Sequence, residues 1–173
     1  MRTRIGRTAG QHVAIAVALT IGLGAGSVVA AGPESLGGAG SQSPAATLQG
    51  SWRVEITVRH CLTGDALLSP FPALATFAQG GTVTTSDGGM SPAARSTGLG
   101  LWQRLRGRTF AARTEAFTFS PTGTLSGRQR ITQEITLDRE GATFEAQVSS
   151  EVVNTMGQVV FTGCATSVGR RLD

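Results

Sequence analysis

Residues 50–59 read GSWRVEITVR, and their pattern indicates the class of structure that this chain forms. Apolar Trp52, Val54, Ile56 and Val58 stand at every second position, with polar or charged side chains between them. An alternation of this kind is typical of a β-strand that has one face against a core and the other in water. We therefore predict a half-buried strand at the start of an all-β domain.

Further strand-like segments follow at short intervals, and no amphipathic helix separates them. The turns between them are rich in glycine, as in the pair Gly80-Gly81, which is typical of a tight hairpin. The sequence thus predicts eight strands, the other seven covering residues 73–78, 82–86, 98–105, 108–119, 125–138, 144–152 and 158–168. Eight sequential antiparallel strands can close around side chains or one small ligand. We expect an eight-stranded antiparallel up-and-down barrel, with a two-sheet sandwich as the alternative.

Two glutamines interrupt the apolar face of the segment 125–138. Gln129 and Gln133 share this face with Ile131, Ile135 and other apolar side chains. A buried amide without a partner costs about 1–3 kcal/mol, so both side chains need a hydrogen-bonding partner. Neighbouring side chains, trapped water and a ligand in a cavity are the three alternatives.

The first 31 residues have the layout of an export signal. Arginines at positions 2, 4 and 7 precede an uncharged apolar stretch over residues 13–23, and small residues up to Ala31 offer a cleavage site. We predict a Sec-type signal peptide over residues 1–31 and a secreted, periplasmic or cell-envelope location. The alternative is an uncleaved membrane anchor, and only such a segment would bring the chain to a membrane.

A stretch poor in large apolar side chains follows the predicted signal. Residues 32–47 consist mainly of Gly, Ser, Ala and Pro and predict a flexible linker, which leaves residues 48–173 for the barrel domain. The chain has 15 basic residues and 11 acidic ones. Removal of the signal takes away three arginines and leaves the domain almost neutral, so we expect no nucleic-acid partner.

Cys61 and Cys164 are the two cysteines of the chain. An even pair in an exported domain predicts a disulfide, because the oxidising compartments outside the cytoplasm allow such bonds to persist. No second histidine or further cysteine lies after the predicted cleavage site to complete a metal site. We expect no metal and no cofactor.

The triplet Gly50-Ser51-Trp52 at the head of the first strand resembles the G-x-W signature of the lipocalins and related calycin barrels. The resemblance implies that Trp52 seals one end of a lipocalin-like barrel and that an arginine after the last strand packs over its ring. Arg170 or Arg171 is suitably placed for that second role. The chain also resembles small exported bacterial proteins of uncharacterised function, which implies no activity.

His60 continues the inward spacing of Trp52 to Val58 and is a candidate to reach the barrel interior, with Asp65 the nearest acid in sequence. Our leading hypothesis is a small apolar ligand held in the barrel and contacted by Trp52, His60, Gln129 and Gln133. A non-catalytic scaffold or protein-interaction role on the cell envelope is the alternative. A cyclase or isomerase with His60 as its base ranks third, because the sequence contains no complete catalytic constellation. An interior cavity of about 300 Å³ or more would favour the ligand.

Overall fold

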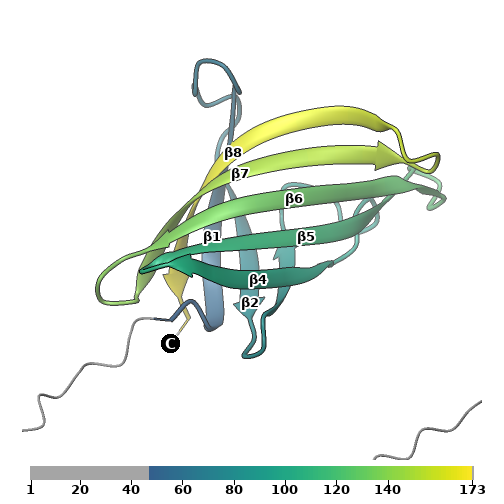
Figure 1. The fold of residues 1–173 in the computed structure, drawn as a ribbon. Coiled ribbons are helices and arrows are strands. Elements are labelled where there is room, and N and C mark those ends of the chain that lie inside the picture. Colours follow the sequence, from purple (N-terminus) through teal and green to yellow (C-terminus); the bar gives the residue numbers. More distant parts are fainter. Residues whose placement is uncertain (1–46, 173) are drawn as a thin grey trace, which may run out of the picture. The chain divides into compact units, whose positions relative to one another are not determined.

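Eight β-strands run through residues 47–172, the part of the chain that the structure, a computed structural model, describes (Figure 1). Neighbours along the chain pair antiparallel, and β1 also pairs with β8, so the sheet closes into a barrel. The predicted barrel is confirmed, and the two-sheet alternative is wrong. The strands are β1 (Gly50–Arg59), β2 (Phe71–Phe77), β3 (Thr82–Asp87), β4 (Gly98–Arg106), β5 (Thr109–Phe119), β6 (Leu125–Leu137), β7 (Thr143–Asn154) and β8 (Val159–Arg171).

The signal-peptide prediction for residues 1–31 lies outside the described residues, and so does the linker prediction for residues 32–47 except at Thr47. Within residues 47–172 no helix is long and apolar enough to cross a bilayer.

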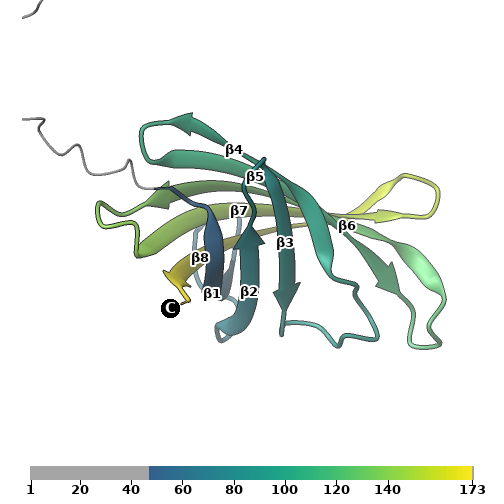
Figure 2. The same ribbon diagram turned by 90° about the horizontal axis from the view of Figure 1, so that it is seen from below.

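The strands differ in length, and this difference gives the barrel two unlike ends. β2 and β3 have 7 and 6 residues, whereas β6 and β8 have 13 each. The last pair between β1 and β8 joins Arg59 to Cys164, so residues 159–163 of β8 continue past the end of β1. Figures 1 and 2 show β6, β7 and β8 reaching beyond the short strands at this end. We call it the open end, and the opposite end the closed end.

Aromatic and aliphatic side chains fill the closed end. The Trp52 and Phe144 rings meet edge to face with centroids 4.9 Å apart, and Phe77 lies between Phe144 and Trp102 at 6.3 and 6.0 Å. Edge-to-face pairs contribute stability beyond the apolar area that they bury. The backbone of β8 can lie against the Phe144 ring because residue 169 is a glycine, and a Cβ at this position would collide with the ring. Other fully buried side chains complete this core: Leu48, Phe110, Ile135 and Leu137.

Arg171, at the end of β8, covers the outside of this core. Its guanidinium carbon lies 4.3 Å from the centroid of the Trp52 ring. The same group donates to the backbone carbonyl oxygens of Thr47, Gln49 and Gly141, at 2.8, 2.6 and 2.9 Å. It therefore ties the start of the described chain, the turn between β6 and β7, and the last strand to one ring. This is the arrangement that the lipocalin resemblance implied for Trp52, with Arg171 and not Arg170 as the partner.

The β6–β7 turn is ordered by a carboxylate. Asp138 accepts hydrogen bonds from the Ala142 amide and the Thr143 hydroxyl, both at 2.9 Å. Burial raises the pKa of the Asp138 carboxyl, but the bonds from the Thr143 hydroxyl and from the amides of Thr143, Ala142 and Gly141 outweigh it and hold the pKa below its usual value. The turn therefore presents the Gly141 carbonyl in a fixed position to Arg171.

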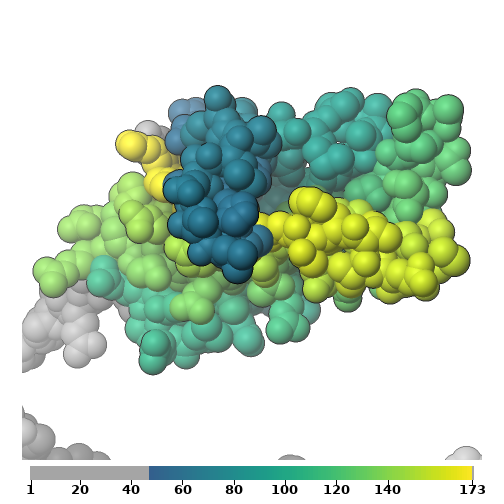
Figure 3. Space-filling view, turned by 90° about the horizontal axis from the view of Figure 1, so that it is seen from above, coloured from purple at the N-terminus to yellow at the C-terminus, as the bar shows by residue number. Residues whose placement is uncertain are grey.

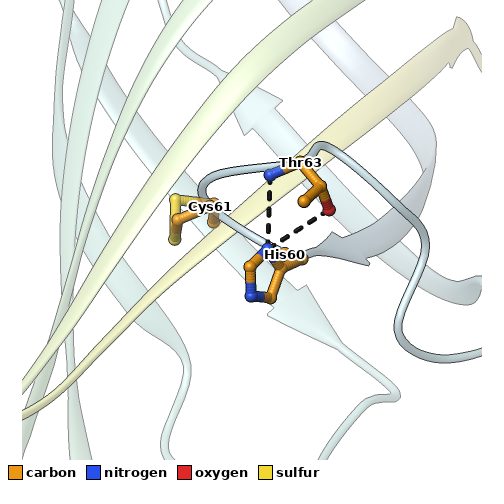
Figure 4. Close-up of a disulfide and its surroundings, with 4 residues drawn as sticks. His60, Cys61 and Thr63 are labelled. Carbon is orange, nitrogen blue, oxygen red and sulfur yellow. Dashed lines mark hydrogen bonds between the residues drawn. A yellow bond between two sulfur atoms is a disulfide. The ribbon is translucent and has the colours of Figure 1, made fainter.

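A disulfide closes the barrel at the other end of the β1–β8 seam. Cys61 lies two residues past the end of β1, Cys164 lies in β8, and their Cα atoms are 5.2 Å apart (Figure 4). The predicted bridge is confirmed. It joins residues 103 positions apart across the pair of strands that makes the sheet continuous.

Replacing both cysteines by serine should lower the free energy of unfolding by about 2–4 kcal/mol, because the bridge restricts a long loop in the unfolded chain. Urea unfolding measures this loss. Reductant should bring the unmodified protein down to the stability of the double variant and leave the variant unchanged. Two free thiols in peptide maps of non-reduced, exported protein would contradict the bridge.

Arg171→Ala should cost about 2–4 kcal/mol of unfolding free energy, since it removes both the cation over Trp52 and the charged donor to three carbonyl groups. Arg170→Ala is the matched control, because Arg170 is the exposed neighbour on the same strand. The control should change stability by no more than about 0.5 kcal/mol. Equal losses in the two variants would show that net charge, and not the contact with Trp52, is responsible.

Candidate functional site

A cavity of about 270 Å³ lies between the closed-end core and the open end of the barrel. The Phe77 and Phe144 rings belong to both the core and the cavity wall, and so form its floor. The volume lies just below the roughly 300 Å³ at which ordinary ligand pockets begin. The cavity thus falls slightly short of the size expected for a ligand-binding barrel, but the interior is not filled by side chains, and the space can hold a ligand smaller than a drug-sized molecule. Most of the wall is apolar: Val54, Ile56, Val58, Phe71, Ala73, Ile131 and Val148.

The entrance to the cavity lies between two loops. Leu68, from the segment after β1, and Met90, from the β3–β4 loop, line the cavity and are 63% and 44% exposed. Seen from above, a recess lies between the blue segment after β1, the yellow strand β8 and the teal part of the chain (Figure 3). A ligand could therefore reach the apolar wall without opening the closed end.

One side of the cavity carries a continuous chain of polar groups. The Arg95 guanidinium pairs with the Asp87 carboxylate, Nη1 to Oδ2 at 2.7 Å, and its Nε donates to the Gln129 side-chain oxygen at 2.6 Å. The Gln129 amide nitrogen donates in turn to the Ser150 hydroxyl at 2.9 Å. The Arg95 side chain is only 5% exposed and that of Asp87 14%. This chain, from β3 to β7, satisfies a buried charge that would otherwise be very costly.

The β3–β4 loop is held in place by backbone hydrogen bonds on both sides of Arg95. The Ser96 amide donates to the Phe117 carbonyl and the Phe119 amide donates to the Ala94 carbonyl, at 3.0 and 2.8 Å. The loop thus continues the sheet along the part of β5 that extends past β4. Because Arg95 lies between these two bonds, its backbone is fixed and its side chain is directed into the barrel.

Several polar groups of the wall have hydrogen-bonding capacity that no described residue uses. The hydroxyl oxygens of Thr85 and Ser167 are buried and without a partner within residues 47–172. The side-chain amide of Gln133 lines the cavity, and no hydrogen bond joins it to another described residue. A buried hydroxyl without a partner costs free energy, so these groups mark the places where a polar atom of a ligand would be stabilised.

The residues that the sequence singled out occupy three different places. Gln129 and Gln133 line the cavity as expected, although among the described residues only the Gln129 side chain has hydrogen-bonding partners. Trp52 lies beneath the Phe144 ring in the closed-end core and is not part of the cavity wall. For all three, contact with a ligand stays a prediction.

His60 does not continue the inward face of β1, because that strand ends at Arg59. The backbone turns there, with the Gly64 amide donating to the His60 carbonyl and the His60 amide donating to the Asp65 carbonyl. His60 is exposed, lies outside the cavity wall, and its Nδ1 accepts from the Thr63 amide at 3.2 Å (Figure 4). The Asp65 carboxylate accepts from the Thr63 hydroxyl instead of orienting the imidazole.

Sequence reasoning missed Asp87 and Arg95. Asp87 shares the inward face of β3 with the buried Val83, but the predicted strand stopped one residue short of it. Arg95 lies in a loop of Gly, Ser, Pro and Ala, where no periodicity indicates a side-chain direction. Its one signal in the sequence is that it is an isolated charge in a run of small residues.

Among the described residues, no three His, Cys, Asp or Glu side chains gather where they could hold a metal ion. A scan of the chain against models of known protein families found no match. A search of the curated proteins for similar sequences found none either. The case for a function therefore rests on the cavity and its polar side.

Gln129→Leu and Gln133→Leu should separate the two glutamines. Gln129→Leu removes the acceptor of Arg95 Nε and the donor to the Ser150 hydroxyl, and should cost about 1–3 kcal/mol of unfolding free energy. Gln133→Leu removes no hydrogen bond within the described chain, so its stability should stay within about 0.5 kcal/mol of the parent. Chemical unfolding measures both. A larger loss for Gln133→Leu than for Gln129→Leu would contradict the polar chain described above.

Proposed function

We propose that the protein is an exported binding protein that holds one small, mainly apolar molecule inside its barrel. The observation that supports this is the cavity: an unfilled space of about 270 Å³ with an apolar wall, a few polar groups on one side, and a closed floor. Ligand pockets generally combine these features, since burial of apolar surface supplies affinity and a few polar groups supply orientation.

The unequal ends of the barrel agree with this role. The closed end is fixed by Trp52 and Arg171, whereas exposed apolar side chains such as Leu68 and Met90 stand at the entrance. An apolar ligand would cover part of this exposed surface as it binds, so burial of the entrance and burial of the wall both favour binding.

The compartment is part of the proposal. The Cys61–Cys164 bridge is consistent with an oxidising location outside the cytoplasm. Together with the export signal predicted for residues 1–31, it supports a secreted, periplasmic or cell-envelope binding protein. The enzyme hypothesis gains no support from the geometry, because its proposed base, His60, lies outside the cavity wall.

Native mass spectrometry of the exported protein tests the proposal directly, together with a thermal-shift screen of alkyl alcohols, isoprenoids and small aromatics. A bound molecule should raise the melting temperature in a concentration-dependent way, because it binds the folded state alone. If no mass co-purifies and no compound shifts the transition near its solubility limit, the scaffold alternative is favoured.

Val148→Phe should abolish that ligand-induced shift while leaving the melting temperature of the free protein unchanged or higher. Val148 is half-buried and faces the cavity, so the larger ring fills the space that the ligand needs. Gln147→Phe is the matched control, because Gln147 is the adjacent, exposed residue of the same strand. A ligand shift that survives in Val148→Phe, or that is lost equally in both variants, would place the ligand elsewhere.

A further inference from the structure

The polar side of the cavity is electrically balanced before any ligand arrives. Arg95 supplies the one positive charge of the cavity wall within the described residues, and Asp87 supplies the one negative charge. They are in direct contact at 2.7 Å. Gln129, Gln133, Thr85, Ser150 and Ser167, the remaining polar side chains of the wall, are neutral.

We propose that the bound molecule is an apolar compound that carries a neutral hydrogen-bonding group, such as a hydroxyl or a carbonyl, and that the cavity discriminates against the carboxylate of the same skeleton. This inference rests on the proposed function and specifies the chemical class of its ligand.

The unused hydrogen-bonding capacity of the wall fits a neutral group. Thr85, Ser167 and Gln133 provide two hydroxyls and one amide, and each of these groups can both donate and accept. Thr85 Oγ1 and Arg95 Nη2 both lie near Gly98, since a Cβ placed on this glycine would stand 2.5 Å from the first atom and 3.5 Å from the second. A ligand hydroxyl or carbonyl oxygen beside Thr85 could be hydrogen-bonded there without displacing Asp87 from Arg95 Nη1.

A carboxylate would find the opposite situation. It would lose its hydration on entering an apolar space, and its attraction to Arg95 would be offset by repulsion from Asp87 in the same wall. Two of the Arg95 nitrogens are already engaged, Nη1 by Asp87 and Nε by Gln129, so the Nε/Nη2 side of the guanidinium is not free for a bidentate contact and its charge is already compensated by Asp87. A cationic ligand would be repelled by Arg95, and Asp87 could not compensate its charge because Asp87 is already paired with Arg95.

Decanol and decanoate have the same ten-carbon skeleton and differ in their polar group, so they compare a neutral ligand with a carboxylate. Isothermal titration of the oxidised protein at pH 8 should give a dissociation constant for decanol at least about tenfold lower than for decanoate, because only the carboxylate has to bury an uncompensated charge. This ratio can be measured on the unaltered protein, so it tests the inference even if a variant fails to fold.

Asp87→Asn should remove the preference for decanol. The asparagine oxygen can still accept the hydrogen bond that the Gly89 amide donates to Asp87 Oδ1, but the counter-charge of Arg95 is gone. Decanoate should then bind at least about tenfold more tightly than it binds the unaltered protein, as a replacement partner for the guanidinium. Asp65→Asn is the matched control, since it removes the same charge from an exposed loop outside the cavity wall and should leave the ratio unchanged.

Failure of the ligand preference and failure of ligand binding give different results. If decanoate binds the unaltered protein as tightly as decanol, or if Asp87→Asn leaves the ratio unchanged, the neutral-ligand inference is overturned while the binding function stands. If neither compound binds, and none of the compounds screened above binds either, the binding function itself is overturned. Tighter binding of decanol to the unaltered protein, with the preference lost in Asp87→Asn and kept in Asp65→Asn, supports both.

Discussion

The contact between Arg171 and the Trp52 ring holds the closed end of the barrel together. Trp52 stands near the start of β1 and Arg171 at the end of β8, so the contact spans the one seam where strands distant in sequence must pair to close the sheet. The three carbonyl groups that Arg171 also binds belong to the start of the described chain and to the β6–β7 turn. A single side chain therefore closes the seam and caps the core at the same end.

Closure at one end determines what the other end can do. The large rings are gathered over Trp52, and the wall above them carries smaller side chains such as Val54, Ala73 and Val148. The interior thus has a packed part at the closed end and an unfilled part above it, because these smaller side chains leave space in the middle of the barrel. The disulfide at Cys61 holds the far end of the same seam, so the cavity lies between two fixed points along β1 and β8.

The polar chain through Arg95 has a structural and a functional consequence. It anchors the β3–β4 loop to β6 and β7, which stabilises the open end where the short strands stop. It also makes the polar side of the cavity neutral, because the charge of Arg95 is balanced within the protein. Within residues 47–172, the Thr85 and Ser167 hydroxyls and the Gln133 amide of the wall have no hydrogen-bonding partner, and these neutral groups favour a neutral polar group on the ligand.

Most of the fold could be predicted from the sequence, because period-two alternation and glycine-rich turns are local signals. These signals predicted the number of strands and the inward face of β6, including Gln129 and Gln133, and the cysteine pair predicted the disulfide. His60 was misplaced because a spacing rule holds only while the strand continues, and β1 ends at Arg59. Arg95 could not be predicted, since its direction comes from tertiary pairing of its loop with β5.

A small molecule held in the barrel should occupy the space above the Phe144 ring. Intermolecular nuclear Overhauser effects between a bound alkyl alcohol and methyl-labelled protein measure this position directly. We expect contacts to the methyl groups of Ile56, Ile131 and Val148, which line the cavity. Contacts confined to exposed methyl groups of the outer surface, such as those of Leu99 and Leu101, would contradict it.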